Sequence, residues 1–286
     1  MEYVTLSNGV KMPKLGFGVF QISKEECEKC VLDAIKAGYR HIDTAQSYFN
    51  EEEVGNAISK CGIPREELFI TTKVWIDNYG YENAKQSVLK SMDKLKTNYI
   101  DLVLLHQPFS DYYGAYHALQ NLYEEGKIRA IGVSNFSPDR LADIAAFNKI
   151  APHVNQVEAN PLHQQVNAQE NMLKRGVQME AWAPFGEGKS NMFKNPVLKE
   201  IADKYDKSVA QVILRWLMQR NIVALAKSTH TERIKENFEI FDFQLSDEDM
   251  NKITALDTKS SLFFDHQTPE TVDRFVNMIE ERKGRI

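Results

Sequence analysis

The sequence predicts an α/β fold in which eight parallel strands close into a (β/α)8 TIM barrel. Short apolar runs alternate with segments of helical periodicity along most of the chain, an order typical of βα repeats. Eight units in 286 residues match the size of such a barrel, and no Pro- or Gly-rich linker divides them, so residues 1–286 are expected to form one domain. The alternative is an open doubly wound sheet, which usually carries a G-x-G-x-x-G turn after an early strand. GFGVFQ has only two of those glycines.

Each element follows from its local pattern. The opening residues 3–14 predict a hairpin with a two-residue turn at Asn8 and Gly9. The barrel strands are expected at residues 14–20, 39–43, 68–74, 99–106, 127–134, 153–158, 177–182 and 222–227. The helices are expected at residues 24–37, 51–60, 82–95, 112–125, 138–147 and 167–175, then after Asn195-Pro196, after Ser208 and from Thr231. Ser208 and Gln211 have the spacing of a capping box.

Composition narrows the possible partners. The net charge of -5 offers no basic surface for nucleic acid, so a small-molecule partner is expected. The first ten residues lack the pattern of a signal peptide, and no uninterrupted apolar run is long enough to cross a membrane. We therefore expect a cytoplasmic protein without a membrane partner.

Cys27 and Cys30 form a C-x-x-C pair, a spacing found in redox pairs and zinc sites. The pair falls within a segment of helical periodicity, and no second pair with metal-ligand spacing is present. We interpret the two cysteines as neighbours on one helix face and expect no metal site.

Four residues of complementary chemistry stand where apolar runs end, namely Asp43, Tyr48, Lys73 and His106. In a (β/α)8 barrel the carboxyl ends of the strands form the rim that carries the active site. An acid, a phenol, an ammonium and an imidazole on one rim could move a proton to or from an oxygen. Each residue could instead be structural, as an ion pair, a packed tyrosine or a core histidine. The four together favour catalysis.

The chain resembles the aldo-keto reductase family along almost all of its length. The matching motifs, in the family's order, are YRHIDTAQSYFNEEEVGNAI, LFITTKVW, DLVLLHQP, GKIRAIGVSNF, NQVEANP, AWAPFGEG and KSTHTERIKENF. Within the family it looks most like the bacterial reductases related to 2,5-diketo-D-gluconate reductase and microbial prostaglandin F synthase. The resemblance implies an NADP-dependent oxidoreductase that reduces small aldehydes or ketones to alcohols with NADPH. It also implies a monomer, and no exposed apolar stripe in the sequence argues otherwise.

The residue chemistry is consistent with that activity. Hydride addition leaves negative charge on the carbonyl oxygen, so the site needs a proton donor and positive potential. Tyr48 would donate the proton, and the Lys73 ammonium would lower its pKa. Asp43 would hold Lys73, and His106 would orient the carbonyl oxygen.

A second cluster, formed by Lys227, Ser228 and Arg233, stands at the expected start of a helix, where free N–H groups and the dipole favour an anion. By resemblance the anion is the adenosine 2′-phosphate of NADP, with Glu236 and Asn237 on the adenine side. A solvated basic helix start is the alternative.

Four further positions match the family residues that hold the nicotinamide. Ser134, Asn135 and Gln156 would bind its carboxamide, and Trp182 would stack on its ring. These assignments depend on the resemblance, because a Trp or Gln at a strand end is otherwise usual in a core.

Four residues next to the matched positions are expected to line the substrate pocket, namely Phe20, Phe49, Trp75 and Gln107. The tail at residues 261–265 resembles the C-terminal loop that closes the site in relatives. Phe49 and Gln107 stand where many relatives have glycine and tryptophan, which leaves the substrate preference open. Ala226 and His230 also depart from the family pattern, which leaves the choice of NADPH over NADH less strict.

Two other functions stay open at this stage. One is an NADPH-binding sensor or interaction barrel with little turnover. The other is an aldolase-like barrel in which Lys73 forms a Schiff base with the substrate.

Overall fold

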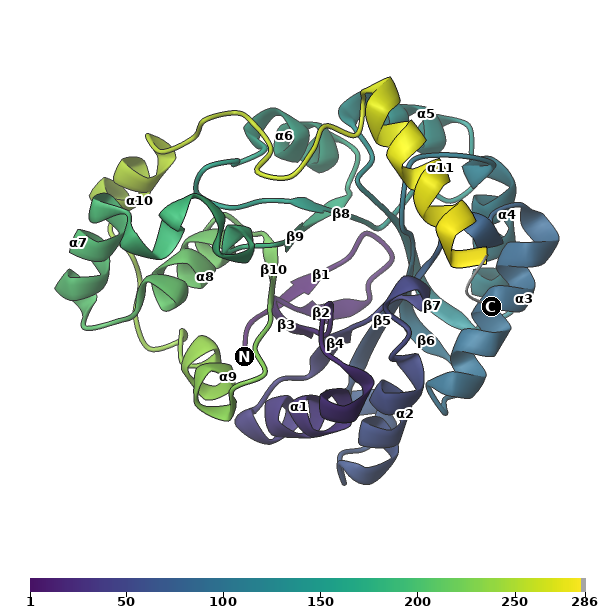
Figure 1. Ribbon diagram of the computed structural model, residues 1–286, viewed down its shortest axis with the longest axis horizontal. Helices are drawn as coiled ribbons and strands as arrows, with labels where there is room; N and C mark the ends of the chain where they lie inside the picture. The colour runs from purple at the N-terminus through teal and green to yellow at the C-terminus, as the bar shows by residue number, and fades with distance from the viewer. Residues whose placement is uncertain (284–286) are drawn as a thin grey trace.

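Eight parallel strands close into one barrel in the computed structural model, which describes residues 1–283 (Figure 1). Around the barrel the order of strands is β10, β3, β4, β5, β6, β7, β8 and β9. Their bounds are β3 Leu15–Gly18, β4 His41–Asp43, β5 Phe69–Val74, β6 Ile100–Leu105, β7 Ile128–Ser134, β8 Val154–Glu158, β9 Gln178–Trp182 and β10 Val223–Ala226. The predicted (β/α)8 barrel is confirmed, and each strand lies within its predicted range.

Helices surround the strands and cover their outer faces (Figure 1). They are α1 Lys24–Ala37, α2 Glu51–Lys60, α3 Tyr81–Lys94, α4 Tyr112–Glu124, α5 Pro138–Ala146, α6 Val166–Lys174, α7 Pro196–Tyr205, α8 Val209–Gln219, α9 Thr231–Phe238, α10 Asp247–Thr254 and α11 Pro269–Lys283. The capping box at Ser208 and Gln211 is confirmed. Helices α10 and α11 were not predicted. No helix within residues 1–283 is both long and apolar enough to cross a membrane.

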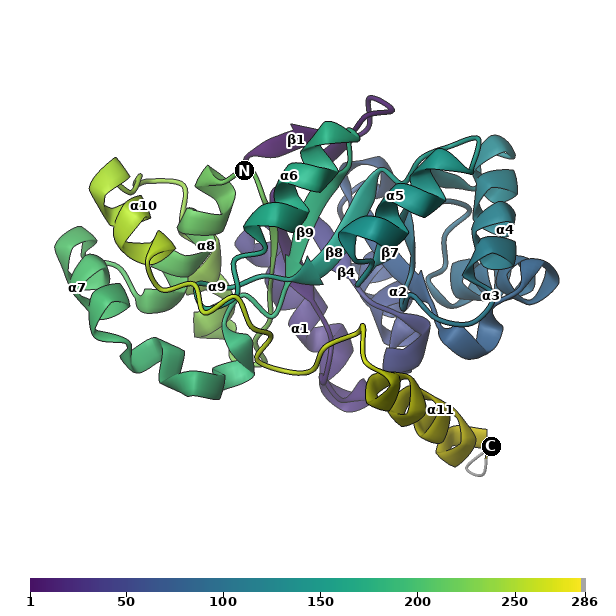
Figure 2. The ribbon, with the colours of Figure 1, turned by 90° about the horizontal axis from the view of Figure 1, so that it is seen from above.

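The N-terminal hairpin covers one end of the barrel, and the C-terminal segment with α11 lies at the other end (Figure 2). Strands β1 Tyr3–Thr5 and β2 Lys11–Pro13 pair antiparallel, as predicted. The predicted two-residue turn is wrong. Leu6 and Gly9 enclose a turn whose central residues are Ser7 and Asn8, and Gly9 follows in the left-handed conformation at φ 86°. This arrangement is a type I turn with a bulge, for which glycine at the last position is favoured.

Strands β5 and β6 are buried on both faces, as expected where helices lie outside and side chains fill the barrel inside. The interior also contains polar groups. His41 is fully buried there, and a Cβ on Gly16 of β3 would come within 2.6 Å of its ring nitrogen. Glycine is therefore required on β3 to make room for His41.

Parallel strands bring their carboxyl ends to one rim. Asp43, Ser134 and Trp182 are the last residues of β4, β7 and β9. Lys73 is the penultimate residue of β5, and His106 directly follows β6. The fold thus delivers the polar strand ends predicted from the sequence to one side of the molecule.

Candidate active site

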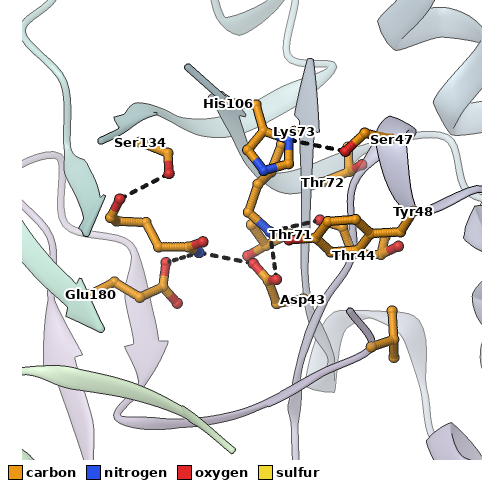
Figure 3. A network of polar contacts seen from close by, with 12 residues as sticks. Asp43, Thr44, Ser47, Tyr48, Thr71, Thr72, Lys73, His106, Ser134 and Glu180 are labelled. Carbon is orange, nitrogen blue, oxygen red and sulfur yellow. Dashed lines mark hydrogen bonds and ion pairs between the residues drawn. The ribbon is translucent and has the colours of Figure 1, made fainter. Parts of the chain in front are cut away.

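The Lys73 ammonium is the centre of the polar network at the rim (Figure 3). Its Nζ donates to Asp43 Oδ1 at 2.5 Å and to the Thr44 carbonyl at 3.0 Å, and it lies 3.3 Å from the Tyr48 hydroxyl. Lys73 is fully buried and Asp43 is 3% exposed. A short 3-10 helix, Gln46–Tyr48, turns the chain after β4 so that Tyr48 returns over the end of β5. The structure therefore brings three of the four expected catalytic residues into one hydrogen-bonded group.

Burial shifts the pKa values of Lys73 and Tyr48, and neighbouring groups oppose that shift to different degrees. Burial by itself lowers the pKa of Lys73, but the Asp43 carboxylate and the Tyr48 phenol raise it further than burial lowers it. Lys73 is therefore an ammonium. Burial raises the pKa of Tyr48, and the Lys73 charge offsets only part of that rise. The influence of Lys73 on Tyr48 has the expected direction, but burial is the larger effect.

His106 completes the group from the end of β6. Its ring meets Tyr48 edge-on with the centroids 5.7 Å apart, and meets Trp75 in the same way at 5.0 Å. Its Nδ1 lies 3.4 Å from the Ser47 hydroxyl. The imidazole is 9% exposed, so one polar ring reaches the space above the tyrosine without being fully solvated.

A cavity of about 470 Å³ opens over these residues. Its lining includes Asp43, Tyr48 and His106, together with three of the four predicted pocket residues, Phe20, Trp75 and Gln107. Phe49 is the exception: it is 57% exposed and is not among the described residues that line the cavity. Phe49 ends the 3-10 helix in the left-handed conformation at φ 61°, beyond the turn that places Tyr48.

The four residues expected at the nicotinamide all line the same cavity. Ser134 Oγ donates to the Gln156 carbonyl at 2.9 Å. Asn135 Nδ2 donates to the His106 carbonyl at 3.1 Å, and its Oδ1 accepts from the Trp182 indole at 2.8 Å. Gln156, Asn135 and Trp182 thus stand beside the tetrad, the group formed by Asp43, Tyr48, Lys73 and His106. Their amide groups and the aromatic ring face one space. They fit a planar ring that carries a carboxamide.

The residues expected at the adenosine phosphate lie farther along the rim, after β10. Lys227 lines the cavity, and Ser228 Oγ accepts from the His230 backbone N–H at 3.0 Å. Arg233 is exposed in the first turn of α9. Two cations beside a helix start fit a phosphate group. Glu236 and Asn237 lie on the same helix and do not line the cavity, and Asn237 is buried.

Two sets of residues at this site were not predicted. The first is a buried polar layer below the tetrad that includes His41 and Glu180. A charged residue inside the apolar run QMEAW was the available signal for Glu180. The second is a group of cavity-lining side chains beyond the predicted loop at residues 261–265, namely His266, Arg274, Phe275 and Met278. Phe263 and Phe264, which also line the cavity, belong to that predicted loop.

The C-terminal segment is attached to the barrel through a buried carboxylate. Glu158 at the end of β8 accepts from Ser261 Oγ at 2.6 Å and from the Leu262 backbone N–H at 3.0 Å. This attachment places Phe263 against Trp182, with ring centroids 5.0 Å apart. The expectation that residues 261–265 lie over the site agrees with this placement.

The comparison with protein families identifies the chain. The model of the "Aldo/keto reductase family" matches residues 14–258. The chain belongs to the aldo/keto reductase family. Like other aldo-keto reductases it is an oxidoreductase, and the family uses NADP(H) to interconvert carbonyl compounds and alcohols.

Similar proteins have several activities. Glyoxal reductase of Bacillus subtilis is 48% identical over 89% of this chain and 92% of its own length. The 9,11-endoperoxide prostaglandin H2 reductase of Trypanosoma cruzi is 47% identical over 88% of this chain and 90% of its own. An aldo-keto reductase of Bombyx mori, solved in complex with NADP, superimposes with a TM-score of 0.88 at 33% identity, over 92% of this chain and 95% of its own.

Proposed function

We propose that this aldo-keto reductase reduces small aldehydes or ketones to alcohols with NADPH, and that Tyr48 donates the proton. The observation that carries the proposal is the contact between the Tyr48 hydroxyl and the buried Lys73 ammonium, 3.3 Å apart at the base of the cavity. We also propose that residues 1–286 act as one barrel domain.

When bound, NADPH supplies a hydride to the carbonyl carbon. The chain's own residues then have to manage the charge that builds on the carbonyl oxygen. The Tyr48 hydroxyl gives that oxygen its proton, and Lys73 stabilises the phenolate that is left. His106, beside Tyr48, hydrogen-bonds the carbonyl oxygen and directs it toward the hydroxyl.

The position and burial of Lys73 strengthen the effect of its charge on Tyr48. Asp43 and the Thr44 carbonyl hold the ammonium in place, so its position depends little on side-chain freedom. Phe20 lies against Tyr48 with ring centroids 4.9 Å apart and limits the access of water from one side. In this setting the charge of Lys73 acts over a short distance with little screening.

The Schiff-base alternative fits less well. An amine nucleophile has to be deprotonated and reach the substrate. Lys73 is fully buried, its pKa is raised above the ordinary value, and its Nζ is engaged by Asp43 and Thr44. The non-catalytic sensor function has no specific observation in its favour, and absence of NADPH oxidation across a broad panel of carbonyl compounds would revive it.

The test replaces Tyr48 by phenylalanine, which removes only the hydroxyl. We expect Tyr48→Phe to lower kcat with a reactive aromatic aldehyde by about 10²-fold to 10⁴-fold, the usual contribution of general acid catalysis. The affinity for NADPH, followed by fluorescence, should stay nearly unchanged. Tyr3→Phe on the exposed edge of the hairpin is the matched control. A Tyr48→Phe enzyme that keeps wild-type turnover would rule out the assigned role.

A further inference from the structure

Glu180 is a fully buried carboxyl group in the middle of β9, below the catalytic residues (Figure 3). It is joined to them through Gln156. The Gln156 Nε2 group donates to Glu180 Oε2 at 2.9 Å and to Asp43 Oδ2 at 3.0 Å. Asp43 in turn holds Lys73, and Lys73 contacts Tyr48. A continuous hydrogen-bonded chain therefore runs from Glu180 to the proposed proton donor.

This arrangement fixes the orientation of the Gln156 carboxamide. A carboxamide has two N–H hydrogens and one carbonyl oxygen. Glu180 and Asp43 each accept one of those hydrogens, so turning the amide by half a turn would set its carbonyl oxygen against the Asp43 carboxylate. The carbonyl oxygen of Gln156 is left as the acceptor for a ligand in the cavity that Gln156 lines.

The charge around Glu180 is unbalanced. Two buried carboxyl groups, Asp43 and Glu180, share a single ammonium, which is bonded to Asp43. His41 of β4 does not supply a second cation. Its Nε2 lies 3.7 Å from Glu180 Oε1, and burial lowers its pKa to about 3. Glu180 Oε1 has no hydrogen-bond partner within residues 1–283.

Burial and the neighbouring Asp43 charge together raise the pKa of Glu180 to about 8. At neutral pH the group is therefore mainly a carboxylic acid. A neutral acid still accepts a hydrogen bond from Gln156, but it does not compete with Asp43 and Tyr48 for the charge of Lys73.

We propose that Glu180 is a positioning residue for the reduction: as a neutral acid it holds Gln156 for the nicotinamide carboxamide and leaves the Lys73 charge to Asp43 and Tyr48. The proposal rests on the function proposed above and adds a residue outside the tetrad. The protonation state of Glu180, inside the barrel, then affects catalysis at the rim.

A pH dependence follows from the groups that face Glu180, namely Asp43 and His41 of β4, Lys73 of β5 and, beyond Lys73, Tyr48. As pH rises through about 8, Glu180 loses its proton and places a second negative charge beside Asp43. That charge raises the pKa of Tyr48, so the phenol releases its proton less readily. The reduction should therefore slow as the pH rises through this range.

The experiment compares the pH profiles of wild type and Glu180→Gln with one aldehyde and NADPH. Wild type should lose about tenfold in kcat/KM between a pH of about 7 and about 9, as expected for a single ionisation. Glu180→Gln cannot ionise there and should lose this decline. Either oxygen of a carboxylic acid can accept from Gln156, whereas the NH2 group of the new amide cannot. Gln156 is therefore held less firmly in this variant, and the Kd for NADPH should rise roughly threefold to tenfold.

Glu51→Gln is the matched control. Glu51 is 2% exposed, accepts from Thr72 Oγ1 at 2.7 Å and belongs to α2, outside the barrel. This variant should keep the wild-type pH profile. Identical profiles and identical NADPH affinities for wild type and Glu180→Gln would overturn the proposal.

A second measurement needs neither a folded variant nor turnover. An infrared titration of the wild-type protein should show a carboxylic-acid carbonyl band at neutral pH that disappears as the pH rises through about 8. Absence of that band at neutral pH would overturn the proposal even if Glu180→Gln fails to fold. Failure of the reductase function is a separate result, seen as no NADPH oxidation by the wild-type protein with any aldehyde.

Discussion

Replacing Lys73 by methionine should destabilise the protein strongly, because it separates a buried ion pair. Methionine keeps most of the length of the side chain but removes the ammonium. Asp43 is 3% exposed and would retain only the Gln156 amide as a donor among the contacts described above. Loss of one partner of a buried pair costs about 3–5 kcal/mol, which is a large share of the roughly 5–15 kcal/mol that stabilises a typical native protein.

The measurement is equilibrium unfolding in urea, followed by tryptophan fluorescence, for Lys73→Met and a matched surface variant. Lys149→Met removes the same group from an ion pair with Glu124 that has the same 2.5 Å distance but a lysine side chain that is 78% exposed. The surface variant should lose no more than about 1 kcal/mol. Adding Asp43→Asn to Lys73→Met should restore much of the loss, because no uncompensated charge then remains. A loss below about 1 kcal/mol for Lys73→Met would refute the reasoning.

Two further variants test the cofactor end and the packing of the helices. Arg233→Gln should raise the Kd for NADPH about tenfold and leave the Kd for NADH within about twofold, because only NADPH carries the adenosine 2′-phosphate. Equal effects on both cofactors would show that Arg233 does not bind that phosphate. Gly55→Ala in α2 should destabilise the protein by about 1–3 kcal/mol, although alanine is the better helix former, because its Cβ would meet the backbone of Lys94 and Leu95. Thermal unfolding measures this loss, and a stabilised Gly55→Ala protein would contradict the packing.

Local sequence patterns were enough to predict the barrel and its rim. Each strand is a short, mostly apolar run, and for nearly every strand a polar or aromatic residue stands at or next to its carboxyl end, as at Asp43 and Trp182. Strand order, burial and the position of the rim then follow from the rules of parallel β/α folds. The residue types at the strand ends indicate only that these side chains could transfer a proton. The family motifs indicate the reaction, which is the reduction of a carbonyl group.

The features that were missed depend on contacts between distant parts of the chain. Phe49 follows Tyr48 directly, but a single left-handed residue at the end of a 3-10 helix leaves it outside the cavity lining. Helix α11 contributes Phe275 to the cavity, and nothing in the local sequence indicates that a segment so far along the chain returns to the rim. Its path depends on the attachment of Ser261 to Glu158, a contact across 103 residues.

The relation between the rim and the layer below it follows from the two-residue period of a strand. Side chains at positions i and i+2 share one face, so β4, β5 and β9 each place a polar residue beneath a rim residue. The buried residues of this lower layer are His41, Thr71 and Glu180. They lie below Asp43, Lys73 and Trp182, and the Thr71 hydroxyl, 3.0 Å from His41 Nε2, joins two of them. Because water is excluded from this layer, its charge state acts on Asp43 and Lys73 with little screening. A substitution of Glu180, which lies outside the family motifs quoted above, would therefore change proton transfer at Tyr48.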